Sequence, residues 1–225
     1  SQRRRTPRLA AAGSATAANN AAAVAFINTF AATCAAALGW LATEKIRDGH
    51  ATSLGAASGV VAGLVAITPA CAAVSPVGAM AIGVIAGVLC ALAVGLKYKL
   101  KYDDSLDVVG VHLVGGLVGT LLIGFFATEA SPTGINGLFY GGGFDQLGKQ
   151  AVGAGAVLGY SLIVTAIIVL VIKAIMGLRV TEDEEVAGID LSLHAEQAYE
   201  LADTGGGVFA GIGKHAASAY EEEGR

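Results

Sequence analysis

Five stretches of this sequence are apolar over about 20 residues, the length that a helix needs to cross a hydrocarbon core of about 30 Å. They cover residues 21–43, 54–73, 77–96, 108–128 and 152–175. Hydrophobic residues make up 54% of the 225-residue chain and charged residues only 14%, which lies outside the usual range for a soluble domain. The sequence therefore predicts an all-α, polytopic membrane helix bundle.

The distribution of basic residues predicts how this bundle is oriented. Lys and Arg follow the first, third and fifth stretches, at Lys45, Arg47, Lys97, Lys99, Lys101, Lys173 and Arg179. By the positive-inside rule these ends are cytoplasmic, so we expect a transmembrane domain over 10–179 and a cytoplasmic tail over 180–225. Four arginines near the N-terminus break the rule. We interpret residues 1–9 as a disordered or non-native basic start and expect a further helix before residue 10.

One histidine, His112, lies well inside the fourth apolar stretch. Ionisable side chains at this depth are rare and mostly line a bundle interior or a wet cavity, so His112 is a candidate functional residue. A buried histidine that is hydrogen-bonded to a neighbouring helix, with no part in function, is the alternative. Both interpretations stay open at this point.

Glycines recur at four-residue spacing in four of the stretches: Gly55, Gly59 and Gly63, then Gly83 and Gly87, then Gly115 and Gly119, then Gly155 and Gly159. This spacing is typical of helices whose backbones approach closely in a membrane. Thr68 and Pro69 interrupt the second stretch, because proline removes a backbone donor. We expect a structural kink there, with a contact to a solute as the alternative.

The remaining polar residues give no sign of a metal or cofactor site. Cys34, Cys71 and Cys90 stand singly in apolar runs, without the spacing of metal ligands, which favours small buried side chains. The glycines at 141–143 follow no predicted strand and precede no Lys-Ser or Lys-Thr pair, so they do not form a phosphate loop.

Five motifs, in order along the chain, carry a resemblance to a known family. They are AGSATAAN (12–19), SLGAASGVVAGLVAITPA (53–70), DDSLDVVGVHLVGG (103–116), GLFYGGG (137–143) and GLRVTEDEEVAGIDLSLHAEQAYE (177–200). Over about residues 11–200 the chain resembles the second half of the ammonium transporter (Amt/MEP/Rhesus) family. The resemblance implies the second inverted repeat and the last helix of an eleven-span, trimeric transporter, in which each subunit holds its own pore.

The resemblance also implies roles for individual residues. His112 matches the second of two stacked pore histidines, Val108 and Thr68 match pore-lining positions, and Ser14 matches the serine of an outer recruitment site for ammonium. Asp104 and Asp107 match acidic positions at the start of the pore helix, and we interpret both as helix caps. The first pore histidine and the whole first repeat have no counterpart in this chain.

The tail after Val180 contains 11 acidic residues and two basic ones. Its composition alone predicts a solvated, partly disordered segment. The resemblance instead implies a cytoplasmic lock that docks under the neighbouring subunit and contacts PII-type nitrogen regulatory proteins. The tail residues that we assign to this role are Gly188, Asp190, His194, Glu196 and Tyr199.

Together these inferences predict a transporter that moves ammonium or methylammonium across the plasma membrane. Carrying a full cation through apolar helices is costly, whereas neutral ammonia passes more cheaply, and a neutral imidazole exchanges protons near pH 7. We expect a homotrimer in the lipid bilayer, no enzymatic activity, no cofactor or metal, and no nucleic-acid partner. The alternatives are a non-conducting half-transporter or regulatory subunit, and a different inverted-repeat symporter for a small solute.

Overall fold

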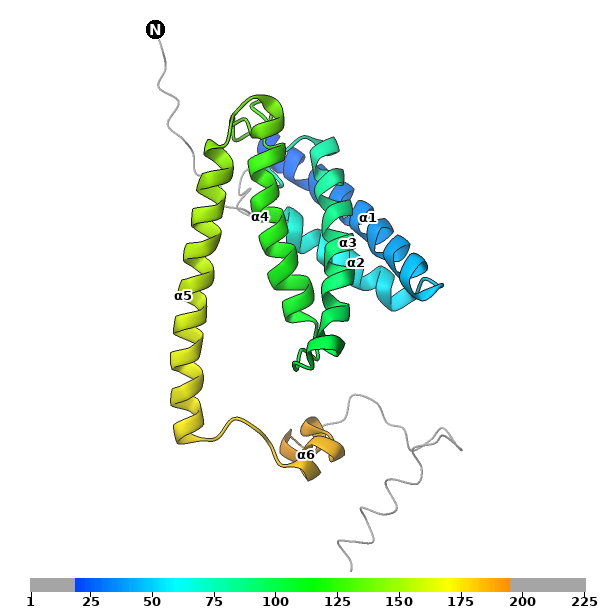
Figure 1. Ribbon diagram of the computed structural model, residues 1–225, viewed down its shortest axis with the longest axis vertical. Coiled ribbons are helices and arrows are strands. Elements are labelled where there is room, and N and C mark those ends of the chain that lie inside the picture. Colours follow the sequence, from blue (N-terminus) through cyan, green and yellow to red (C-terminus); the bar gives the residue numbers. More distant parts are fainter. Residues whose placement is uncertain (1–18, 195–225) are drawn as a thin grey trace, which may run out of the picture. The chain divides into compact units, whose positions relative to one another are not determined.

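The computed structural model describes residues 19–194 and divides within one long helix, after Ile163, into two units that are described separately. The first unit contains the helix bundle (Figure 1). In chain order the elements are α1 (Asn20–Asp48), α2 (Ser53–Ile67), α3 (Pro76–Leu100), the π-helix η1 (Val108–Leu113), α4 (Val114–Phe126), the 3₁₀-helix η2 (Leu138–Tyr140), α5 (Asp145–Ile175), α6 (Glu182–Ala187) and the π-helix η3 (Asp190–His194). Within the described range, the only β-type pairing is one isolated bridge, Val74 to Ala127. The predicted all-α class is confirmed.

Four helical stretches are long and apolar enough to cross a membrane: α1, α3, η1 with α4, and α5. The second predicted stretch, 54–73, differs from expectation. Its helix α2 has 15 residues, which at 1.5 Å per residue reaches only about 22 Å. Helix α2 ends at Ile67 because Pro69 has no N–H and its ring crowds the preceding turn. The chain thus leaves the helix at this point, where we expected a kink.

Helices α1, α2, α3 and α4 pack through their backbones, and this confirms what the glycine spacing predicts for α2, α3 and α4. A Cβ added to Gly83 or Gly87 would collide with the carbonyl oxygen of Ala32 or Ala36. From the other side, a Cβ on Gly39 of α1 would lie 2.8 Å from the carbonyl oxygen of Val84. Side chains larger than hydrogen therefore do not fit at these three glycine positions, where α1 crosses α3.

Helix α5 does not follow this pattern. A Cβ added to Gly155 or Gly159 would meet nothing within 4 Å, and no residue of α5 is buried. The four-residue spacing of small residues in α5 therefore makes no contact in the part of the chain that the structure describes.

The two ends of the bundle differ in chemistry. At the basic end, marked by Arg47, Lys97 and Lys99, α1 and α3 terminate while α2 and η1 begin. At the opposite end α2 and α4 terminate and α3 begins. There a loop over 127–144 folds back on α4, and the ring of Phe139 lies 5.6 Å from that of Phe125 and 5.2 Å from that of Phe126.

In the second unit, the short helix α6 begins with a capping box. The Thr181 hydroxyl accepts from the Glu184 N–H, and the Glu184 side chain accepts from the Thr181 N–H. The hydrogen bond from the Thr181 backbone, followed by that from its hydroxyl, lowers the pKa of Glu184. All described residues from 181 to 194 are exposed or half-buried.

We predict that Gly83→Ala destabilises the bundle, because its methyl group would be forced against the backbone of Ala32. Overpacking of this kind costs about 1–3 kcal/mol, so the thermal unfolding midpoint in detergent, followed by circular dichroism, should fall. Gly155→Ala is the matched control, since its methyl group meets open space. It should leave the midpoint unchanged or slightly raised, because alanine favours helix by about 1 kcal/mol over glycine. Equal midpoints for the two variants would contradict the backbone contact.

Candidate functional site

The segment that carries His112 begins with a cap formed by Asp104. This side chain is 9% exposed. Its Oδ1 accepts from the Val108 N–H at 2.8 Å, and its Oδ2 accepts from the N–H groups of Val109 at 3.0 Å and Gly110 at 3.3 Å. The first N–H groups of a helix have no partner inside the helix. Asp104 therefore supplies three of the bonds that the start of η1 lacks.

Asp107 occupies the N-cap position of η1, but its side chain forms no capping hydrogen bond and has a different structural role. Its backbone is left-handed, at φ 55°. Its Oδ1 instead accepts from Lys97 Nζ at 2.5 Å, and the same ammonium group donates to the Asp104 carbonyl at 3.1 Å. Lys97 thus ties the end of α3 to both acidic residues in front of η1.

His112 lies in a wide turn of helix. Residues Val108–Leu113 form a π-helix, and the Val114 N–H is shared between the carbonyls of Val109 and Val111. Single turns of this kind occur mostly inside α-helices and often at functional sites. No motif in the sequence distinguishes this turn from ordinary α-helix.

One face of η1 and α4 is packed against the bundle. A Cβ on Gly110 would lie 2.7 Å from Val94 in α3, and Val111 is buried, with Cys90 Sγ donating to its carbonyl at 3.7 Å. One turn further along, Gly115 faces α2, where a Cβ would lie 3.3 Å from Val65.

The other face is open, and it carries His112. Val108 is 52% exposed, and the side chain of His112, four residues later on the same face, is exposed as well. Among the described residues, His112 forms no hydrogen bond. Within residues 19–194, therefore, no neighbouring helix buries His112 or holds it by a hydrogen bond.

Thr68 is exposed at the end of α2, where its hydroxyl donates to the Leu64 carbonyl at 2.6 Å. Helices α2 and α4 run in the same direction, since Gly115 faces Val65 and Gly119 faces Ala66. Thr68 therefore lies beyond the level of Gly119, nearer the opposite end of the bundle than His112 does. The structure thus brings Val108 and His112 together on one face, with Thr68 displaced along the neighbouring helix.

The remaining predicted residues fall into the tail or outside the described range. Ser14, Glu196 and Tyr199 lie outside the residues that the structure describes. Gly188 ends α6 with a φ of 96°, and Asp190 and His194 begin and end η3 with exposed side chains. The described residues contain no cluster of three His, Cys, Asp or Glu side chains that could hold a metal ion.

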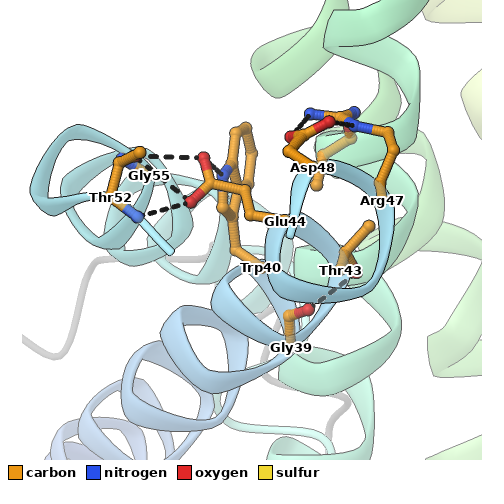
Figure 2. Close-up of polar contacts among 9 residues, drawn as sticks. Gly39, Trp40, Thr43, Glu44, Arg47, Asp48, Thr52 and Gly55 are labelled. Carbon is orange, nitrogen blue, oxygen red and sulfur yellow. Dashed lines mark hydrogen bonds and ion pairs between the residues drawn. The ribbon is translucent and has the colours of Figure 1, made fainter. Parts of the chain in front are cut away.

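A group of hydrogen bonds around Glu44 at the basic end, which we call the Glu44 bracket, was not predicted from the sequence (Figure 2). Glu44 in α1 accepts from Trp40 Nε1 at 3.1 Å and from the N–H of Thr52 at 3.0 Å, while Thr52 in turn caps α2 through the Gly55 N–H. A cleft of about 880 Å³ adjoins it, lined mainly by residues of α1, α2 and α3, together with Asp107 and Val114. The only sequence signal was a carboxylate placed one helical turn after an interfacial tryptophan.

Helices of membrane length, joined by backbone contacts and presenting one histidine on an apolar face, define a multi-pass α-helical membrane protein. The chain belongs to the Ammonium Transporter Family, whose sequence profile matches residues 11–199. It is 60% identical over 203 residues to an ammonium transporter of Mycobacterium tuberculosis (strain H37Rv), covering 88% of this chain and 43% of that protein. The corresponding values for an ammonium transporter of Aquifex aeolicus are 50% identity over 191 residues, with 84% and 44% covered.

Solved structures agree with this assignment. The crystal structure of Saccharomyces cerevisiae Mep2 matches with a TM-score of 0.67 and 36% identity, over 72% of this chain and 38% of that one. A sensor Amt protein matches with a TM-score of 0.69 and 32% identity, over 78% and 42%. The chain spans less than half the length of each of these relatives.

We predict that Asp104→Ala loosens the start of η1, because the N–H groups of residues 108–110 lose their acceptor. Loss of a cap costs about 0.5–2 kcal/mol, and hydrogen exchange at residues 108–110 should become faster in detergent. Asp103→Ala is the matched control, since the Asp103 carboxylate is exposed and accepts only from the Ser105 hydroxyl, at 2.9 Å, among the described residues. Wild-type protection of residues 108–110 in the Asp104 variant would show that the cap is not needed.

Proposed function

We propose that this chain forms one wall of a path for ammonium across the plasma membrane. The observation that carries the proposal is the exposed, unbonded His112 beside Val108 on an otherwise apolar face. A side chain that can ionise is expensive in hydrocarbon unless the face that carries it borders a wet cavity or other protein. Membership of the Ammonium Transporter Family supplies the substrate class.

The chemistry of the face suits separation of a proton from ammonia. A neutral imidazole can accept or donate a proton near pH 7, whereas the surrounding valine and leucine side chains offer nothing to a full cation. Ammonia, as a small hydrogen-bonding solute, crosses such a face more cheaply than ammonium does. Potassium cannot release a proton, so the same face excludes it.

The fixed backbone around His112 supports this role. Asp104 holds the first N–H groups of η1, Lys97 holds both acidic residues, and Gly110 lies against α3. Each of these contacts lies on the packed side of the helix or at its start. They leave the imidazole free to face the path.

The rest of the assembly belongs to the same proposal. The bundle functions as a homotrimer, its basic end and the acidic tail face the cytoplasm, and the tail docks under a neighbouring subunit and contacts a PII-type regulatory protein. The excess of Lys and Arg at one end supports the orientation. The resemblance of the tail motif supports the docking, and its described side chains from 181 to 194 are available for contact.

A non-conducting half-transporter is the second candidate function. The face with His112 is open in the described residues, and nothing in them forms its opposite wall. Vesicles that hold only this chain should therefore not take up labelled methylammonium. Uptake by this chain alone would exclude the non-conducting candidate.

We predict that His112→Ala abolishes or greatly alters methylammonium uptake. The test uses a chimera in which this chain follows the portion of the Mycobacterium tuberculosis relative that it does not match. His112→Glu keeps a group that can relay protons but adds a fixed charge, so residual transport with weaker exclusion of potassium is expected. His50→Ala is the control, because His50 is exposed in the turn between α1 and α2. Unchanged uptake and selectivity in both His112 variants would reject His112 as part of the path.

Removal of the tail after Gly177 should lower uptake by the same chimera without changing its thermal unfolding midpoint. The described tail residues from 181 to 194 are all exposed or half-buried, so in this proposal the tail acts by docking and not by filling a core. A chimera with alanine at Gly188 and Asp190 tests the predicted lock in the presence of the whole tail. Full uptake in the truncated protein would mean that the tail is a solvated extension.

A further inference from the structure

Asn28 in α1 is a fully buried polar side chain that the proposed path does not use. It is 0% exposed. Its amide nitrogen donates two hydrogen bonds of 2.8 Å, one to the Cys71 carbonyl and one to the Val74 carbonyl. Its oxygen has no hydrogen-bond partner among the described residues.

The two acceptors lie in the turn that follows the break in α2. After Ile67 the backbone forms two tight turns. The Ala70 N–H donates to the Ile67 carbonyl at 2.9 Å, and the Ala73 N–H donates to the Ala70 carbonyl at 2.8 Å. Carbonyl groups outside a helix need another donor when they lie in an apolar environment. Asn28 donates one hydrogen bond to each of the two acceptor carbonyls from a different helix.

The same turn is bonded to the chain that leaves α4. Val74 forms the isolated bridge to Ala127, and the Thr128 N–H donates to the Ala73 carbonyl at 3.1 Å. One set of hydrogen bonds therefore joins α1, the end of α2 and the end of α4. Helix α2 carries Thr68, and α4 continues the π-helix that carries Val108 and His112.

We propose that Asn28 is a positioning residue, which holds the ends of α2 and α4 together and so fixes Thr68 relative to the face of Val108 and His112. The amide oxygen has no hydrogen-bond partner among the described residues. This is unfavourable in the interior, and a leucine of similar volume would avoid the cost. Packing alone therefore does not account for an asparagine at this position. The amide is useful at this site because its two N–H groups bind two carbonyls in the turn that follows the broken helix.

The inference rests on the proposed function for its consequence, but its structural part can be tested in the chain itself. The chain contains four asparagines, Asn19, Asn20, Asn28 and Asn136. Asparagine labelled with ¹⁵N should show one slowly exchanging side-chain NH₂ group in detergent, and Asn28→Asp should delete that signal and so assign it. A rapidly exchanging Asn28 amide in the wild-type chain would overturn the proposal, whether or not any variant folds.

Two variants then separate positioning from packing. Asn28→Asp keeps the shape and, as a neutral carboxyl in this buried site, at most one donor, whereas Asn28→Leu keeps an apolar volume and loses both donors. Each should raise hydrogen exchange at Ala70, Ala73 and Thr128 by about tenfold or more, the factor that corresponds to losing about one hydrogen bond. Exchange at Gly55, at the basic end, should not change. If hydrogen exchange at Ala70, Ala73 and Thr128 in the leucine variant equals that of the wild type, the proposal is overturned. An equally large rise in hydrogen exchange at Gly55 would also overturn it.

Transport supplies the last readout. In the chimera, Asn28→Leu should lower the maximal rate of methylammonium uptake by about tenfold, as expected when reacting or binding groups are misplaced by a small distance. Thr43→Val is the matched control, because Thr43 is buried in the same helix and its hydroxyl donates only to the Gly39 carbonyl of its own helix, at 2.8 Å. If Asn28→Leu speeds hydrogen exchange at the turn after α2 but leaves methylammonium uptake unchanged, the link between Asn28 and the path is overturned. A wild-type chimera without uptake would reject the proposed function, and hydrogen exchange at the turn would then decide the role of Asn28 separately.

Discussion

Hydrocarbon offers no hydrogen bonds, so a membrane helix that stops or widens must find partners for its backbone within the protein. This chain departs from regular α-helix at two places that bear on the candidate path. At η1, the carboxylate of Asp104 takes three N–H groups. At the end of α2, the amide of Asn28 holds two carbonyls. One acidic acceptor and one amide donor therefore make both irregularities compatible with the bilayer.

Close backbone packing makes these long-range bonds reachable. Because Gly83 and Gly87 let α3 approach the carbonyls of Ala32 and Ala36, helix α1 lies deep enough in the bundle for Asn28 to reach the turn after α2. The same closeness lets the Arg47 guanidinium donate to the Ala91 carbonyl at 2.8 Å. Large side chains at the crossing of α1 and α3 would separate both sets of partners.

Features that depend on a short window were predictable from the sequence. Apolar length predicts α1, α3, α4 and α5, four-residue glycine spacing predicts the packed faces of α2 to α4, and an aspartate four residues before an apolar run predicts the cap by Asp104. Pro69 marks an interruption, but whether a helix bends or ends there depends on where the freed carbonyls find donors.

Features that depend on distant partners were not predictable. The pairing of Lys97 with Asp107 and the bracket of Glu44 with Thr52 join residues 10 and 8 positions apart, and Asn28 reaches 43 and 46 positions along the chain. The π-turn at His112 has no sequence signature, although Asp104 and Lys97 bind the residues at its start. In α5 the glycine spacing predicts close packing, yet Gly155 and Gly159 meet nothing within 4 Å. Spacing shows that a close approach is possible and does not identify the partner.

The packing of η1 and α4 is one-sided, and this asymmetry links the fold to the proposed path. On one side glycines press the helix against α2 and α3, so its position cannot relax to bury His112. On the other side His112 and Val108 stay exposed. A histidine held in such a place is unfavourable against lipid, and the chain spans less than half the length of the relatives that it matches. In the proposed transporter, the cost is avoided when the remainder of the protein forms the opposite wall, because the imidazole then borders a path and not the bilayer.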